Sequence, residues 1–561
     1  MVYIRNMPSL QRYTSHGITY YRIVESYRLE GRPRIRVLAH LGKVEDLLNL
    51  VQGRLGELRL QSSMAGAVSA LHNLAQELDL AGHINRVLQQ KQPCIQQRDG
   101  LTVGETLVAA MIARACNPGS KRAFADWAAT TYLPELMGFS ACKLTSQHFW
   151  DQMNAVPKSA LASIEESILI EVVRREQMKI EACAYDTTNF YTYLDSRNKR
   201  CRLAQRGHNK QKRHDLRQFG LALVVDRLSQ LPLFHRLYAG NRNDARTLQE
   251  LIGPIRRRLR RLQDRPQQLT LVFDAGANSA CNLREINTHY VVVLRAFDQR
   301  KWLSRVAEKC RPVELSSGET VSAYRERREV LKAEREVVAV FSERLYEGQV
   351  RGLHQQLEKL LPALERLGNR SRYQPETVRR RLTKLLDCQY IRRLIHYELE
   401  AEPTGGTRIR IWTDWHEYRR LLRSYFGFRV LATDRQDWTT AEIIEVHRSQ
   451  SKAESAFRDL KDPAMIATHP QFHWTDQKLK VHAFICVMAY LLVRLLWWRF
   501  QRQTGRKISP RSLLAQLKKI RVVRVVKVSG KAGRPKVQYQ LEEMDKDIEK
   551  IGRLTRAFPV L

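Results

Sequence analysis

The chain has 561 residues, of which 95 are lysine or arginine and 58 are aspartate or glutamate, so its formal net charge is +37. This excess excludes the neutral surface typical of a metabolic enzyme. Nucleic acid is the favoured partner, because the basic residues are spread through apolar-patterned sequence. With 43% hydrophobic residues the chain can form folded cores, in about three to five domains.

No pattern in the sequence predicts export or a membrane anchor. The first ten residues, MVYIRNMPSL, lack the charged and apolar regions of a signal peptide, so we expect a cytoplasmic protein. The longest apolar run, 482–498, contains Arg494 and is shorter than the roughly 20 residues of a membrane helix, which predicts a buried core helix. Nine scattered cysteines without a CxxC pair predict reduced thiols and no structural zinc.

The first 165 residues predict two small modules. Residues 18–41 contain two β-rich runs around the turn-forming EGRP, a pattern typical of a hairpin, so we expect a basic hairpin module at 1–62. Residues 63–165 have helical periodicity, with Ser120 and Ser146 as candidate N-caps. This helical region fits either a DNA-binding helix-turn-helix or a bundle with a packing role.

From residue 166 the apolar pattern becomes that of strands. EACAYD, a hairpin turning at 228–230, LTLVFD and YVVVLR predict a mixed sheet in residues 166–305. The charged stretch 306–410, with one strand candidate at 335–343, is expected to be an insertion. The sheet resumes in 411–500 with FRVLATD and a helix from about 440 to 460, and 501–561 is a basic tail with a second hairpin. The expected fold class is therefore mixed α/β.

Three carboxylates stand out as candidate metal ligands. Asp186 ends one apolar run and Asp274 ends another, so both are expected at strand ends of one sheet. Glu454 lies in HRSQSKAESAFRDLK, on a helical stripe that borders the apolar stripe. Together they would supply hard oxygen ligands suited to Mg²⁺ or Mn²⁺. Each aspartate alone also fits an ordinary turn residue, and the helix alone fits an amphipathic surface helix.

These segments resemble the DDE transposases of bacterial insertion sequences, of the insertion-sequence-four type. The resemblance runs from about residue 3 to 498. Its motifs are YDTTNFY with Asp186, RGHNKQKRHDLRQ (207–218), PLFHRLYAGNRND (232–244), FDAGANSACNL with Asp274, AESAFRDLK with Glu454 and Lys461, and the segment 468–492. It implies a ribonuclease H-like catalytic domain interrupted by the insertion, with Asp186, Asp274 and Glu454 as catalytic metal ligands.

The resemblance also implies the reaction. Such a protein binds the terminal inverted repeats of its element, hydrolyses the DNA at each end with Mg²⁺ or Mn²⁺, and joins the 3′ hydroxyl to target DNA. A homodimer in the active complex and a bacterial, nucleoid-associated location are expected. Two other functions remain open: a catalytically inactive DNA-binding regulator, and a metal-dependent nuclease without strand transfer.

Seven residues are candidates for DNA contact. They are Lys461, Arg448, Lys210, Arg213, Arg217, His447 and Gln450. His447 and Gln450 occupy positions where the family usually has Tyr and Arg, which contact DNA near the cleaved end. Arg448 is a candidate substitute for that arginine, although it points from a different helix face.

Overall fold

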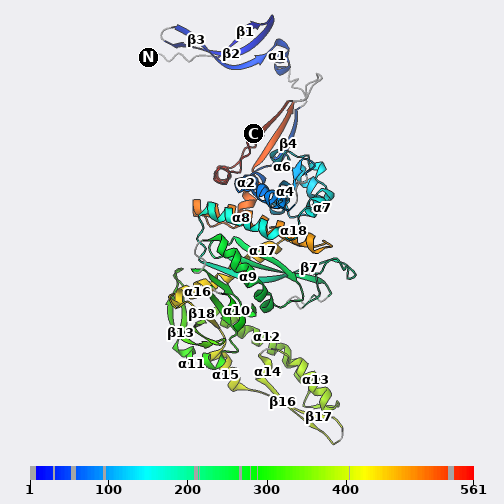
Figure 1. Ribbon diagram of the computed structural model, residues 1–561, viewed down its shortest axis with the longest axis vertical. Helices are drawn as coiled ribbons and strands as arrows, with labels where there is room; N and C mark the ends of the chain where they lie inside the picture. The colour runs from blue at the N-terminus through cyan, green and yellow to red at the C-terminus, as the bar shows by residue number, and fades with distance from the viewer. Residues whose placement is uncertain are drawn as a thin grey trace.

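The computed structural model describes residues 8–29, 32–51, 58–91, 97–207, 213, 215–263, 268–277, 279–286, 288–388, 390–403, 405–469, 471–527 and 536–560. The described parts form an elongated molecule (Figure 1). An N-terminal sheet lies at one end, a helical region and a central sheet lie in the middle, and part of the segment expected to be an insertion forms the other end.

The N-terminal module is a three-stranded antiparallel sheet. It contains β1 (Ser9–Ser15), β2 (Ile18–Leu29) and β3 (Arg32–Gly42), followed by α1 (Val44–Val51). β2 and β3 form the hairpin predicted from the sequence. β1 was not predicted; it joins β2 through His16 and Gly17, both with positive φ (50° and 73°), as a tight hairpin turn of the primed type requires.

The helical region surrounds one long core helix. Its elements are α2 (Gly66–Glu77), α3 (Leu80–Gln89), α4 (Val103–Cys116), α5 (Phe124–Ala129), α6 (Leu133–Met137), α7 (Ser146–Asn154) and α8 (Leu161–Glu176), with a short hairpin of β5 (Gln97–Arg98) and β6 (Leu101–Thr102). Ser120 caps the turn before α5, as predicted. Thr145, rather than Ser146, caps α7, and its hydroxyl accepts from the His148 amide.

The core helix is α18 (Asp476–Thr504), which has 29 residues and extends beyond the apolar run seen in the sequence. By length and composition it could cross a membrane, but 94% of its apolar window is buried inside the protein. It packs against α2, α4, α7 and α8 and against the central sheet at β9. It is therefore the central core helix of the molecule, as the sequence predicted.

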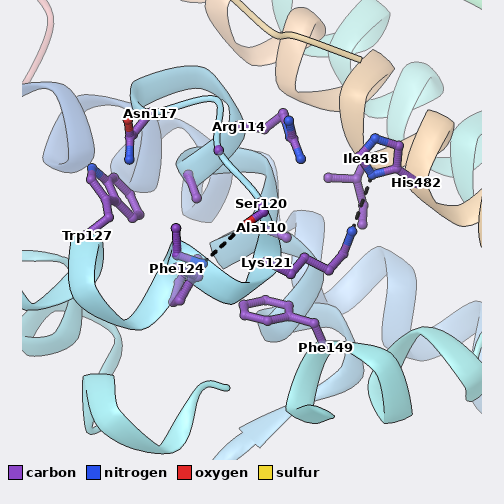
Figure 2. A pocket seen from close by; sticks show the side chains of 13 residues that line it. Ala110, Arg114, Asn117, Ser120, Lys121, Phe124, Trp127, Phe149, His482 and Ile485 are labelled. Carbon is purple, nitrogen blue, oxygen red and sulfur yellow. Dashed lines mark hydrogen bonds between the residues drawn. The ribbon is translucent and has the colours of Figure 1, made fainter. Parts of the chain in front are cut away.

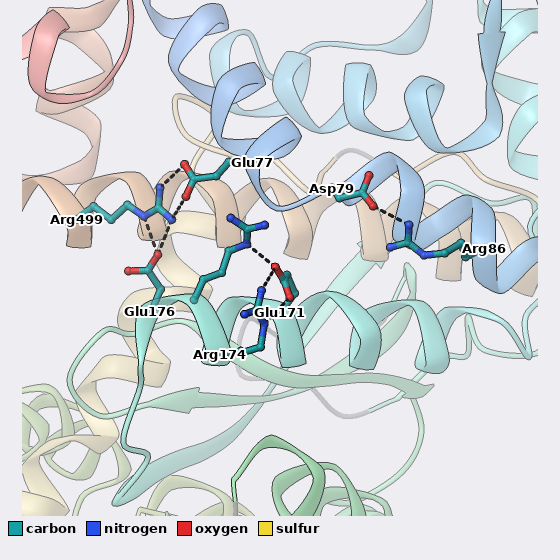
Figure 3. A network of polar contacts seen from close by, with 8 residues as sticks. Glu77, Asp79, Arg86, Glu171, Arg174, Glu176 and Arg499 are labelled. Carbon is teal, nitrogen blue, oxygen red and sulfur yellow. Dashed lines mark hydrogen bonds and ion pairs between the residues drawn. The ribbon is translucent and has the colours of Figure 1, made fainter.

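The C-terminal tail folds back onto the start of the helical region. β19 (Arg521–Lys527) pairs with β20 (Lys536–Leu541), as predicted, and also with β4 (Leu58–Met64); α19 (Pro510–Leu517) and α20 (Lys546–Leu554) complete the tail. Residues 528–535, between these two strands, lie outside the described residues. A separate ion-pair network joins α18 to the helical region: the Arg499 guanidinium contacts Glu77 of α2 at 2.8 Å and Glu176 of α8 (Figure 3).

The central sheet has nine strands in the order β12-β13-β14-β18-β11-β10-β7-β8-β9. Those on the β9 side are β7 (Ala182–Thr192), β8 (Arg217–Asp226), β9 (Pro232–Ala239), β10 (Thr270–Phe273) and β11 (His289–Leu294). β7, β8 and β9 are antiparallel, whereas β10 runs parallel to both β7 and β11. The hairpin turn between β8 and β9 is where it was predicted. α9 (Asp244–Leu262) and α10 (Ala280–Glu285) connect the later strands.

The segment expected to be an insertion has two parts. After α11 (Arg300–Val306), β12 (Arg311–Glu314), β13 (Thr320–Val330) and β14 (Ala333–Phe341) extend the central sheet, because β14 pairs with β18 (Phe428–Thr433). The rest projects from the sheet (Figure 1), and the projecting part continues past residue 410. Its elements are α12 (Glu343–Leu367), β15 (Arg370–Ser371), α13 (Pro375–Leu385), α14 (Ile391–Leu394), β16 (Ile395–Ala401), β17 (Thr407–Thr413) and α15 (Trp415–Ser424). Its small sheet has the order β15-β17-β16.

A small pocket of about 30 Å³ lies where α4 and the turn before α5 meet α18 (Figure 2). The Lys121 side chain points into this junction and contacts His473 and His482, each with a nitrogen 3.3 Å from the lysine Nζ. Arg114 also lines the pocket, and its guanidinium donates to the Ala467 carbonyl oxygen. The junction therefore gathers several basic groups between the helical region and the core helix.

Candidate active site

Two of the three predicted carboxylates lie on neighbouring parallel strands. β7 pairs with β10 so that Ala184 is opposite Val272. The paired stretch ends there; continued by two residues, the same register would put Asp186 opposite Asp274, because both intervals are 88 residues (272 − 184 and 274 − 186). Neighbouring strands are about 4.8 Å apart, a separation at which two carboxylates on one face of a sheet can share one ligand. Asp274 follows its strand as predicted, whereas β7 continues past Asp186 to Thr192.

Both aspartates point to the face of the sheet that α16 (Thr440–Arg448) and α17 (Gln450–Lys461) cover. Side chains alternate along a strand, so Asp274 shares the face of Val272 and Asp186 shares that of Ala182. Val272 and Ala182 belong to one apolar cluster with Ile443 of α16. Asp274 is exposed and Asp186 is half-buried, so this part of the face is accessible from solvent.

Glu454, the third predicted carboxylate, is held above β7 by the ends of its helix. The Gln450 amide donates to the Tyr185 carbonyl oxygen at 3.1 Å. At the other end of α17, the Lys461 ammonium donates to the Thr188 hydroxyl at 2.6 Å. Glu454 is exposed and lies between these two contacts on the same stripe of the helix, one turn after the first and two turns before the second.

The donor set suits a hard divalent cation. Asp186 and Asp274 match Mg²⁺ or Mn²⁺ in both chemistry and position. Among the residues that the structure describes, no group of three or more His, Cys, Asp or Glu side chains lies close enough together to hold a metal ion. The two aspartates and Glu454 therefore share one face without forming a complete ligand set.

The helix that was predicted to be continuous from about 440 to 460 is divided. α16 ends at Arg448, α17 begins at Gln450, and Ser449 lies between them, with its hydroxyl bonded to the Val446 carbonyl oxygen. His447, in the last turn of α16, is buried. Burial and the positive charge of Arg429 lower the pKa of His447 to about 4, although the negative charge of Asp274 opposes the shift.

The other residues predicted to contact DNA have different surroundings. The Arg448 guanidinium pairs with both carboxylate oxygens of Glu319, at 2.6 and 2.8 Å. Arg213 is paired with Asp215 at 2.8 Å. Arg217 donates to four backbone carbonyl oxygens, those of Asp195, Asn198, Cys201 and Ala204. Lys210 lies outside the described residues.

Sequence reasoning missed the residues of β7 that hold α17. Thr188 accepts the Lys461 bond, and the Phe190 ring lies 5.3 Å from the same ammonium. Both residues belong to YDTTNFY, which was used only for its aspartate. The alternation within this motif, with Asp186, Thr188 and Phe190 on one face of the strand, was the signal that would have linked them.

Comparisons with known proteins bear on the N-terminal part of the chain. Residues 10–93 match the family model of the IS1634 family transposase N-terminal domain. The inferred resemblance to an insertion-sequence transposase is confirmed by this match. The matched stretch contains the N-terminal sheet and the first helices, and it ends before the three carboxylates.

No curated protein matches the chain. Among solved structures, the chain is similar to a piggyBac transposase synaptic complex with hairpin DNA, with 8% identity, a TM-score of 0.35, and coverage of 80% of this chain and 79% of that chain. This TM-score is too low to establish a shared fold.

Proposed function

We propose that this transposase is a DDE enzyme that binds the ends of its own insertion sequence, cleaves the DNA there, and transfers the new 3′ hydroxyl to target DNA. The observation that carries the proposal is the parallel register of β7 and β10, which supports Asp186 and Asp274 as neighbours when it is continued by two residues. The strand order β9-β8-β7-β10-β11, with three antiparallel strands followed by two parallel ones, supports a ribonuclease H-like sheet.

Asp186 and Asp274 would hold the divalent cation, and Glu454 of α17 would complete its ligands. When bound, Mg²⁺ or Mn²⁺ would help to deprotonate the attacking water and would neutralise charge on the phosphate. Hydrolysis forms a bond from the water oxygen to phosphorus and breaks the bond from phosphorus to the 3′ oxygen. Transfer repeats this displacement, with the freed 3′ hydroxyl attacking a target phosphodiester.

The chain's own residues orient the reactants. Lys461, fixed against Thr188, presents a positive charge beside the carboxylates and is the residue we assign to a DNA phosphate. His447 stays neutral at neutral pH because its pKa is near 4, so it adds no charge next to Asp274. With a formal net charge of +37, the protein as a whole attracts DNA strongly. A homodimer bringing two element ends together is part of the proposal.

An inactive DNA-binding regulator is the second candidate. The observation in its favour is that the described carboxylates do not form a complete ligand set. The two functions differ in one result, because a regulator would bind element ends without cutting them in either Mg²⁺ or Mn²⁺.

The test uses a duplex that carries the terminal inverted repeat found beside the reading frame. We expect nicking that needs a divalent cation, and a loss of at least about 100-fold for Asp186→Asn and Asp274→Asn with end binding retained, as for removal of a group essential to the chemical step. Asp387→Asn is the matched control, because this exposed aspartate pairs with Arg392 on the surface. Nicking by either variant at the wild-type rate would overturn the assignment.

A further inference from the structure

We propose that the exposed face of α13 binds the phosphate backbone of target DNA. This basic face comprises Arg379, Arg380, Arg381 and Lys384 of α13 and the adjacent Arg372. The inference rests on the proposed function, because it takes a target duplex as the second substrate.

The segment that contains the basic face is strongly charged. Between Arg370 and Lys384 the sequence has six basic residues and one acidic residue, Glu376, a local net charge of 6 − 1 = +5. The acidic residue is in the first turn of α13 and Lys384 is in the last turn. Both positions suit the helix dipole, so the charge does not destabilise the helix ends.

Packing of α13 determines which side chains reach solvent. Val378 and Leu382 are fully buried and pack with Ile409 of the small sheet. The arginines and the lysine of the basic face are all exposed. The helix therefore uses one apolar stripe to hold its place and leaves its basic residues outside.

These cations differ from the other basic groups of the same subdomain. On the small sheet, Arg410 is paired with Glu398 and Arg408 with Glu402. No described residue forms an ion pair with Arg379, Arg380 or Lys384. Exposed cations held close together repel one another, and a bound polyanion removes this repulsion.

Contacts with the Tyr373 ring hold two arginines of the basic face in place. The guanidinium of Arg381 lies 4.0 Å from the Tyr373 ring centroid and that of Arg372 lies 5.4 Å from it. Hydrogen bonds from both guanidinium groups lower the pKa of the Tyr373 hydroxyl. Fixed arginines lose less conformational entropy when they bind phosphate, which favours a built contact over a merely solvated charged surface.

The chemistry favours target DNA over the element end. Arginine and lysine contacts to phosphate carry no sequence information directly, and a target duplex has a different sequence at each insertion. The basic face also lies at the opposite end of the molecule from the N-terminal sheet, whose domain is the part matched to transposases (Figure 1). A second duplex can therefore be bound there without competing for the N-terminal module.

The experiment uses the full-length protein and a duplex of unrelated sequence, with binding measured by anisotropy over a range of KCl concentrations. For Arg379→Gln/Arg380→Gln/Lys384→Gln we expect affinity to fall at least about tenfold and the slope of log K against log salt to fall by about 2 to 3, at about 0.9 per lost contact. The control, Arg174→Gln/Arg327→Gln/Arg553→Gln, removes the same charge from exposed arginines that pair with Glu171, Glu334 and Glu549. Its slope should stay close to wild type.

Equal changes in both triple variants would overturn the proposal, because they would reflect net charge alone. Strand transfer into plasmid should fall for the α13 variant while cleavage of element-end duplexes continues at the wild-type rate. A matching fall in end cleavage would mean that the face holds the element end and would also overturn it. If the wild-type protein cleaves nothing, the proposed function fails, but the salt-slope comparison still decides whether this face binds duplex DNA.

Discussion

Arg217 was predicted to contact DNA because of its charge, but in the structure its side chain binds the backbone of a neighbouring loop. Its guanidinium donates to four carbonyl oxygens of the 195–204 loop, at 2.7 to 3.3 Å. A lysine keeps the charge but cannot reproduce this fork of donors. We therefore expect Arg217→Lys to lower the free energy of unfolding by about 2–4 kcal/mol, as for lost hydrogen bonds to a charged group.

Denaturant unfolding and salt-dependent DNA binding together check the Arg217 prediction. Arg213→Lys is the control, because this guanidinium pairs on the surface with Asp215 and should tolerate lysine. A stable Arg217→Lys protein with weakened DNA binding would instead support the original prediction of a DNA contact.

The sequence could predict which residues form the candidate site, but not how they lie relative to one another. Asp186 and Asp274 were identified from the apolar runs before them, and the helical stripe identified Glu454 and Lys461. Their mutual placement depends on register: one residue of slippage between β7 and β10 would put Asp274 on the opposite face. Register is set by packing across the whole sheet, and a single sequence does not reveal it.

At the scale of elements, a buried charge cluster attaches α8 to the central sheet. Glu165 of α8 accepts from His235 Nδ1 on β9 at 2.5 Å and contacts Arg258 of α9 at 2.9 Å, and all three side chains are less than a tenth exposed. Glu165→Gln would remove the nearest anion of the buried Arg258 guanidinium and leave it the longer contact with Glu166, at 3.3 Å. We expect a loss of about 3–5 kcal/mol of stability.

Thermal unfolding of Glu165→Gln measures this loss. Glu171→Gln, on the same helix but paired with exposed Arg174 and Arg175, should cost less than about 1 kcal/mol. Adding Arg258→Met to Glu165→Gln should recover most of the stability, because no uncompensated charge then remains. If the double variant is as unstable as the single one, the charge explanation is wrong.

Element boundaries show where sequence patterns stop being informative. The sequence predicted the strands formed by the apolar runs, the two basic hairpins and the core helix. The division of the 440–460 helix at Ser449 was not, because serine is tolerated in helices and its break depends on packing over the sheet. β12 and β13 carry so many charges that only the pairing of β13 with β14, and of β12 with β13, identifies them as strands of the central sheet.

The N-terminal module offers a test of end recognition. β4 begins at Leu58 and pairs with β19. A truncation must therefore stop before Leu58, so that the sheet formed by β4, β19 and β20 stays intact. We expect deletion of residues 1–51 to abolish the preference for element ends over unrelated duplexes, while the remaining protein still binds DNA through its other basic surfaces. Competition binding with both duplexes measures this preference, and an unchanged preference would assign end recognition to the helical region.

In the molecule as a whole, α18 packs against parts of the chain that are far apart in the sequence and joins them in one hydrophobic core. It contacts the helical region, the central sheet and the C-terminal tail, and ion pairs of Arg499 reinforce the contact with the helical region (Figure 3). Basic groups are buried where these parts meet. The stability of the whole assembly should therefore depend on pH through the junction around Lys121 (Figure 2).

The direction of that dependence follows from the pKa shifts. Burial, with the nearby charge of Arg114, lowers the pKa of Lys121 to about 7, and burial also lowers the pKa of His473 and His482 well below the usual value of 6.5. At pH values between its folded-state pKa and its unfolded-state pKa, each group binds more protons in the unfolded protein than in the folded protein. Stability therefore rises with pH below 6.5 because of the histidines and between about 7 and 10.5 because of Lys121.

The variant Lys121→Met tests the rise in stability that we expect above about pH 7. Methionine has a similar length and no charge, so the variant should lose the rise in stability between pH 7 and 9, which amounts to at most about 1.4 kcal/mol per pH unit for one group. Urea unfolding midpoints at pH 7, 8 and 9 measure the effect, with Lys143→Met as the control because that lysine is exposed. We expect the control to follow the wild-type pH profile and Lys121→Met to be flatter. Parallel profiles for all three proteins would mean that the Lys121 ammonium stays charged in the folded protein and that the buried junction does not control stability in this range.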